Sequence, residues 1–273
     1  SYGVHVRQAL RFPEANVLRL GAYVGRWNNP TGKLYYGTWK QSPNGTLFLD
    51  QNPREEEDYS FYAQDEWSVL PDLLAVDAGI RWDRKYIAKG YTADGPGFGV
   101  QTNGGRPFED QWRDPAVSYS FGVRIDVSGR QTVTGRFAVS REVTSSDLIS
   151  STGEQLEDAE ETRYELGYRL TVNEKLALTL TGFQKRISNG VVYDGQRNVG
   201  GTWYPQWASA DFTRVGLEAK AEGDLASAFG YFANVTALRG TVERQNGSGD
   251  DPDDRLPRYL CALGLRYAEG PWT

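Results

Sequence analysis

Hydrophobic and polar residues alternate regularly along the stretch from Pro115 to Ser128. The apolar members of this pattern are Val117, Tyr119, Phe121, Val123, Ile125 and Val127. The residues between them are small, polar or charged, and include Arg124 and Asp126. Because successive side chains point to opposite faces of a β-strand, the stretch predicts a strand with one apolar and one polar face.

The same alternation recurs along the chain and predicts about eleven strands and no helix. The predicted strands lie at about 2–12, 17–27, 59–69, 74–83, 115–128, 131–141, 163–172, 176–183, 212–222, 228–242 and 257–267. Short connectors at about 70–72, 128–130, 173–174 and 223–227 alternate with long ones at about 28–58, 85–114, 142–160, 188–209 and 244–255. Bacterial outer-membrane barrels have short periplasmic turns and longer extracellular loops, whereas a soluble β-sandwich has no reason to confine long loops to one end. The pattern therefore favours an antiparallel transmembrane β-barrel wall.

Composition agrees with a barrel wall. Only 39% of the residues are hydrophobic, yet the chain has 8 Trp, 16 Tyr and 11 Phe, which fits strands that face lipid on one side only. No apolar run reaches the roughly 18–20 residues of a membrane-spanning helix. With 36 acidic against 30 basic residues the chain is mildly acidic, so we expect no nucleic-acid partner.

Several short motifs resemble those of TonB-dependent outer-membrane receptors. Residues 62–67, Tyr-Ala-Gln-Asp-Glu-Trp, and 78–83, Ala-Gly-Ile-Arg-Trp-Asp, resemble a recurrent hairpin of that family. Further resemblances lie at 161–167 (Glu-Thr-Arg-Tyr-Glu-Leu-Gly), 214–218 (Arg-Val-Gly-Leu-Glu), 256–259 (Leu-Pro-Arg-Tyr) and 263–267 (Leu-Gly-Leu-Arg-Tyr). They follow one another in the family's order over roughly 59–268, and the long loops together with the Tyr-Ala-Gln-Asp hairpin also resemble Oar-like members.

The resemblance implies the fold, the location and the partners. It implies a barrel of about 22 strands in the cell outer membrane, with an amino-terminal plug domain and a TonB-binding segment. It also implies energised uptake of a scarce ligand, such as a metal chelate, cobalamin or a glycan. The expected partners are outer-membrane lipid, the TonB complex, and a lid lipoprotein or another outer-membrane protein.

We expect residues 1–273 to form only part of the barrel domain, without the plug domain, the TonB-binding segment or the carboxyl-terminal strands. A passive porin and a structural or surface-interaction barrel remain alternative functions.

Catalytic and metal-binding residues are not predicted. His5 is the only histidine, and the single cysteine, Cys261, has the spacing of an apolar residue on the outer face of a strand. The acidic runs at 55–58 and 250–254 lack the regular ligand spacing of a calcium loop. We therefore expect no catalytic site, no resident metal and no cofactor.

Charged residues at the polar positions of the strands are predicted to face the barrel lumen. In a barrel filled by a plug they would pair with each other and with plug residues, and in an open pore they would set ion selectivity. These residues are Asp77, Arg81, Asp83, Arg124, Asp126, Arg136, Arg163, Glu165, Arg169, Glu218 and Lys220. Aromatic residues in the long loops are predicted to contact a ligand by stacking. They are Trp112, Trp203, Tyr204 and Trp207.

Overall fold

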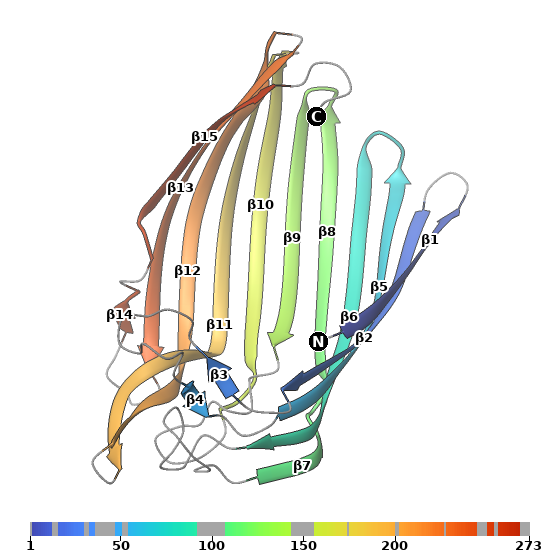
Figure 1. Cartoon of the computed structure of the whole chain (residues 1–273). Helices are drawn as coiled ribbons and strands as arrows, with labels where there is room; N and C mark the ends of the chain where they lie inside the picture. Colours follow the sequence, from blue (N-terminus) through green and yellow to red (C-terminus); the bar gives the residue numbers. More distant parts are fainter. Residues whose placement is uncertain are drawn as a thin grey trace.

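A single curved antiparallel sheet makes up nearly all of the computed structural model (Figure 1). The structure describes residues 2–12, 16–29, 33–35, 47–50, 54–91, 107–142, 156–173, 175–199, 202–226, 228–244, 250–253 and 256–267. Every regular element in these ranges is a β-strand. None of the described residues belongs to a helix long and apolar enough to cross a membrane.

Eleven long strands form the wall, as predicted. They are β1 (Tyr2–Phe12), β2 (Asn16–Asn29), β5 (Arg54–Leu70), β6 (Leu74–Tyr91), β8 (Ala116–Ser128), β9 (Gln131–Glu142), β10 (Ala159–Asn173), β11 (Leu176–Val199), β12 (Thr202–Ala226), β13 (Phe229–Arg244) and β15 (Tyr259–Tyr267). Each long strand pairs antiparallel with the long strand before it and the one after it in the chain. Within the described residues the sheet stays open, with β1 at one edge and β15 at the other.

Four short strands complete the fold. β7 (Pro107–Trp112) pairs with the outer end of β6, beyond the part that pairs with β8. β14 (Asp250–Pro252) extends the edge of β13 in the same way beyond β15. β3 (Lys33–Tyr35) and β4 (Leu47–Asp50) form a separate two-stranded sheet. The extra strands lie at the end of the wall that carries the long connectors (Figure 1).

Two connectors predicted as loops are largely strand. β6 runs on to Tyr91 and β7 pairs with it, so the predicted loop at 85–114 is wrong at both ends. β11 and β12 likewise continue as a paired ribbon through most of 188–209. In Figure 1 this ribbon reaches past the ends of β9 and β10 and bends. The long connectors therefore extend the sheet as well as joining its strands.

Two β-bulges explain why the ribbon resembles a loop in sequence. The register between β11 and β12 shifts before Gly190 and again around Gly195. Asn189 and Gly195 have positive φ angles of 57° and 98°, which Asn and Gly tolerate better than other residues. A side chain at Gly190 would also collide with the Phe212 ring. Asn-Gly and Asp-Gly, which commonly mark turns, here mark bulges that bend a continuous ribbon.

The two faces of the sheet differ in chemistry. On the outer, convex face of the curved sheet, side chains such as Phe121 and Leu166 are apolar. They remain 50% and 66% exposed in the chain alone. The buried apolar cluster of the described residues is small and lies where the ribbon leaves the wall. It consists of Val192, Ala210 and Phe212, with Ile187, Ala208 and Val242 packed against it. Most of the apolar surface is therefore on the outside, as membrane β-barrels require.

Glycines on the opposite face accommodate aromatic rings from the adjacent strand. The Tyr62 ring lies across Gly21, and the Phe183 ring lies across Gly216. A Cβ at either glycine would overlap the ring, so the absence of a side chain allows the close packing. Rings held in this way stiffen a sheet that has no conventional core beneath it.

Candidate functional site: the polar concave face

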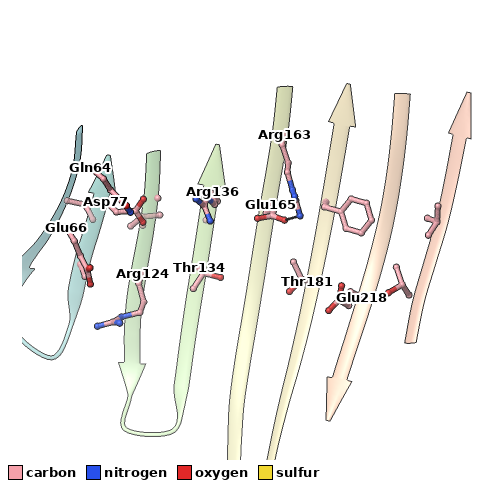
Figure 2. A pocket seen from close by; sticks show the side chains of 18 of the residues that line it. Gln64, Glu66, Asp77, Arg124, Thr134, Arg136, Arg163, Glu165, Thr181 and Glu218 are labelled. Atoms are coloured by element: carbon pink, nitrogen blue, oxygen red, sulfur yellow. Dashed lines mark ion pairs between the residues drawn. The ribbon is translucent and has the colours of Figure 1, made fainter. Parts of the chain in front are cut away.

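The inner, concave face of the sheet carries most of its charged side chains and is hollowed into a groove of about 870 Å³. The register of the strands places several groove residues next to one another across the wall. Asp77 lies beside Gly122, Gly122 beside Arg136, and Arg136 beside Glu165. Figure 2 shows polar side chains from these neighbouring strands along the groove. We call this surface the concave face and the opposite, apolar surface the convex face.

All eleven charged residues predicted for the lumen lie on the concave face. Three ion pairs have both members in this set, and each joins residues two apart on one strand. Arg81 pairs with Asp83 at 2.8 Å, Arg124 pairs with Asp126 at 3.2 Å, and Arg163 pairs with Glu165. Residues two apart share one face of a strand, so the local spacing brings each pair together. Whether this face bounds a lumen stays a prediction, because the described sheet is open.

A second groove of about 780 Å³ lies near the short turns. Glu222 accepts charge-assisted hydrogen bonds from Arg169 at 2.7 Å and forms an ion pair with Lys220 at 2.5 Å. Arg266 of β15 pairs with Asp224 of β12 at 3.4 Å, across the intervening β13. Lys220 and Glu222 are two apart on β12, whereas the pairs of Arg169 with Glu222 and of Arg266 with Asp224 connect strands that are far apart in sequence.

Three of the predicted charges form no ion pair with any residue that the structure describes. Glu218 accepts a hydrogen bond from the Asn234 side-chain amide at 3.0 Å. Asp77 and Arg136 have no oppositely charged atom within 4 Å among the described residues. The Asp77 carboxylate lies over Gly122, the residue that separates Asp77 from Arg136 across the strands. These two opposite charges thus both line the groove (Figure 2).

Sequence reasoning missed other charged groups of the same face. Arg19 pairs with Glu66 at 3.1 Å and Lys185 pairs with Glu161 at 2.6 Å. Lys85 pairs with Glu56 at 3.1 Å. Each of the six lies at a polar position of its strand. Arg19 and Glu66 fall inside predicted strands, and the other four would have been found by extending the alternation beyond the predicted strand ends.

A buried ion pair fastens the connector after β14 to the wall. The Asp253 carboxylate is 1% exposed and accepts hydrogen bonds from Nε and Nη2 of Arg214 at 3.1 and 2.9 Å. The Asp253 backbone N–H donates to the Gly240 carbonyl at 2.9 Å. The Arg214 guanidinium also lies 5.3 Å from the centre of the Phe212 ring. This connector therefore folds onto the concave face beside the apolar cluster.

The predicted ligand-contacting aromatics lie in strands, not in loops. Trp112 is the last residue of β7 and lies on the convex face, against Tyr59 at 5.6 Å and Tyr86 at 4.9 Å between ring centres. The Arg84 guanidinium lies 4.6 Å from the Trp112 ring centre. The hydrogen bond that Tyr86 donates to the Asp110 carboxylate raises the pKa of this phenol. Trp112 thus belongs to an aromatic cluster on the outside of the wall.

The other three aromatics lie in the ribbon. Trp207 packs edge-on against Tyr193, with 6.0 Å between ring centres. Trp203 and Tyr204 belong to β12, and their side chains lie outside the described residues. Contact between these residues and a ligand stays a prediction.

The described part of the wall offers no grouping of three metal-ligating side chains. His5 instead packs against two tyrosine rings, Tyr23 at 6.3 Å and Tyr62 at 6.1 Å between ring centres. Cys261 is exposed among the convex-face residues of β15. The charged side chains of the concave face therefore form a surface that can bind another protein surface or a solute.

Comparison with known proteins identifies the family. A model of the TonB-dependent receptor-like β-barrel matches residues 2–273. The chain therefore belongs to this family of outer-membrane receptors, as its motifs predicted. No curated protein sequence matches it significantly.

Solved structures show the same fold at low sequence identity. The chain resembles the copper transporter OprC with a TM-score of 0.70 and 16% identity, covering 98% of this chain and 41% of OprC. It resembles the closed form of the ferric-catecholate import receptor Fiu from E. coli K12 with a TM-score of 0.62 and 18% identity, covering 98% and 42% of the two chains. For the alcaligin receptor FauA from Bordetella pertussis the TM-score is 0.60, the identity 15% and the coverage 98% and 43%. The chain thus spans about two fifths of the length of these structures.

Proposed function

We propose that this chain is part of the barrel of a TonB-dependent transporter that takes up a scarce metal chelate across the outer membrane. The family match over 2–273 is the observation that carries the proposal. Among the ligand classes that the sequence motifs imply, the structural neighbours favour a metal complex. By their names, they are a copper transporter, a ferric-catecholate import receptor and an alcaligin receptor.

The charge distribution on the concave face supports a transporter over a passive pore. An ion-selective pore uses rings of like charge to create a field along its passage. On this wall, acidic and basic groups pair at short range along single strands, as Arg81 with Asp83 and Arg124 with Asp126. Such pairs cancel most of each other's field. The face is therefore better suited to contact with a protein domain that fills the barrel than to ion selection.

Uptake by the complete gene product tests the proposal. The gene is expressed in a Gram-negative host that lacks its own siderophore receptors, and cells receive radioactive iron(III) on a catecholate or a hydroxamate chelator, or radioactive copper(II). We expect accumulation of at least one complex, and loss of that accumulation when the host TonB is deleted.

Two results would contradict the proposal. One is accumulation that is the same with and without TonB. The other is a steady ion conductance of the purified complete protein in planar bilayers, which would establish a passive porin. A surface-interaction barrel would show neither uptake nor conductance.

A further inference from the structure

Arginine marks the outer limit of the apolar surface on the convex face. Five wall strands run from the short turns toward the long connectors, and on each of them the first charged convex residue is an arginine. These arginines are Arg26 of β2, Arg84 of β6, Arg141 of β9, Arg186 of β11 and Arg239 of β13. We call this row the arginine belt. It lies where the convex face changes from apolar to polar, which is the level of lipid headgroups on a membrane barrel.

Three belt arginines have a partner within the protein. Arg26 contacts Glu57 at 3.8 Å, and Arg141 pairs with Glu160 at 2.6 Å. Arg84 donates from Nε to the Arg113 carbonyl at 3.3 Å and lies over the Trp112 ring. Their positive charge is therefore satisfied locally.

Arg186 and Arg239 differ from the other three. Both are exposed, and neither has a carboxylate within 4 Å or a hydrogen-bond acceptor among the residues that the structure describes. An uncompensated arginine on the lipid side of a barrel is unfavourable unless it lies near an interface with anionic groups. Two such residues on strands separated only by β12 indicate that the partner is supplied by the surroundings.

The two arginines can reach one common ligand. Arg186 lies beside Thr213 and Thr213 beside Thr241, while Arg239 lies two residues from Thr241 on the same face of β13. Two strand spacings and two residues put their Cα atoms about 12 Å apart, a span that two extended arginine side chains can bridge. Thr213 lies on β12, the strand between them, and on the same convex face. Two guanidinium groups and a hydroxyl are the donors that bind a phosphate group well.

The surrounding residues indicate from which side the phosphate comes. One step further out on the convex face, Asp211 lies beside Glu243, so a free anion from solution would meet two carboxylates first. Further inward, toward the short turns, the surface is apolar, with Leu217 50% and Val235 48% exposed. An anion attached to acyl chains can pack its chains on this apolar surface and approach the arginines from the membrane side.

We propose that Arg186 and Arg239, with Thr213, bind the phosphate of a phosphorylated lipid in the leaflet that faces the long connectors. The acyl chains would lie against the apolar residues below. The site needs the convex face to be in a membrane, as the proposed function also does, but it is independent of which ligand is transported.

Thermal unfolding of the complete gene product in neutral detergent tests the site. Three probes are added separately: lipid A with both phosphates, the same lipid after removal of its phosphates, and inorganic phosphate. We expect lipid A to raise the unfolding temperature most. In R186Q/R239Q its apparent affinity should fall on the order of tenfold or more, since each arginine near a lipid surface contributes to binding. The matched control R124Q/R136Q removes the same charge from the concave face and should retain the wild-type affinity.

The possible negative results distinguish the phosphate site, the lipid assignment and the membrane placement. Equal stabilisation by the two lipids, or equal loss in both double variants, would overturn the phosphate site while leaving the membrane placement intact. Stabilisation by inorganic phosphate as strong as by lipid A would establish a free-anion site and overturn the lipid assignment. No stabilisation by either lipid would count against the membrane placement itself, and hence against the proposed transporter as well.

Discussion

The concave and convex faces of this wall are built from the same strands, yet their side chains are stabilised in different ways. On the concave face, charged side chains are neutralised by neighbours on the same strand or on nearby strands, such as Arg124 by Asp126 and Arg19 by Glu66. On the convex face, apolar side chains such as Leu166 stay largely exposed within the described part of the chain, so their burial depends on the surrounding medium. A residue's neighbours two positions away therefore predict its environment better than its adjacent residues do.

The largest difference between the faces is expected for a charge placed at mid-wall. Val235→Arg puts a guanidinium on the convex face, where a charge near the bilayer centre costs about 2–4 kcal/mol. Asn234→Arg adds the same group one residue away, on the concave face, where it can still donate to Glu218. We expect this second variant to change the free energy of unfolding by less than about 0.5 kcal/mol. Urea unfolding of the complete protein in lipid vesicles measures both, and equal costs would refute the assignment of the faces.

The buried ion pair of Arg214 with Asp253 should give the next largest effect. Asp253→Ala leaves the Arg214 guanidinium next to Phe212 without its acceptor, which should cost about 1–3 kcal/mol. The connector after β14 should also become more accessible to protease. Limited proteolysis of intact cells, followed by fragment mass determination, reports on this connector. Unchanged cleavage would mean that the ion pair does not hold it.

Replacement of glycine by alanine should also destabilise the two faces to different extents, with a smaller difference in the free energy of unfolding. Gly216→Ala places a methyl group into the Phe183 ring and should destabilise the wall by about 1 kcal/mol. Gly182 lies on the convex face, where an added methyl group would have no other atom within 4 Å, so Gly182→Ala should be nearly neutral. The same vesicle unfolding assay compares the two. A neutral Gly216→Ala would show that the ring moves aside freely.

The smallest effect is expected for an exposed ion pair of the concave face. The Arg124 side chain is 56% exposed, so Asp126→Asn should cost at most about 1 kcal/mol, and less at high salt. The asparagine can still accept from Thr132, which donates to Asp126 at 2.7 Å. Unfolding measured at two salt concentrations tests this. A salt-independent loss of several kcal/mol would mean that the pair is effectively buried.

The wall strands could be predicted from short stretches of sequence, because the face that a side chain occupies depends only on residues a few positions away. Alternation over a few residues assigns Val123 and Arg124 to opposite faces, and residues two apart meet on one face without any knowledge of the fold. The same holds for Arg163 with Glu165. The family motifs added the strand order, and the structure confirms the eleven wall strands.

Features that depend on distant parts of the chain were not predictable in this way. Asn189 and Gly190 have the composition of a turn, and only the register with β12 reveals a bulge. Trp112 follows a long connector, so its position beside Tyr59 depends on how β7 returns to β6. Asp253 reaches an arginine 39 positions earlier, a contact that no local spacing encodes.

The strand order has a consequence for how such a wall can change in size. Because each long strand pairs with its predecessor and its successor in the chain, a whole hairpin can be removed or duplicated while every other neighbour relation is kept. Removal of one strand alone would reverse the direction of everything after it, and would carry long connectors to the side that now has short turns. Lineages of this wall should therefore gain or lose strands in twos, so that the width of the barrel varies in steps and the sidedness of its connectors does not.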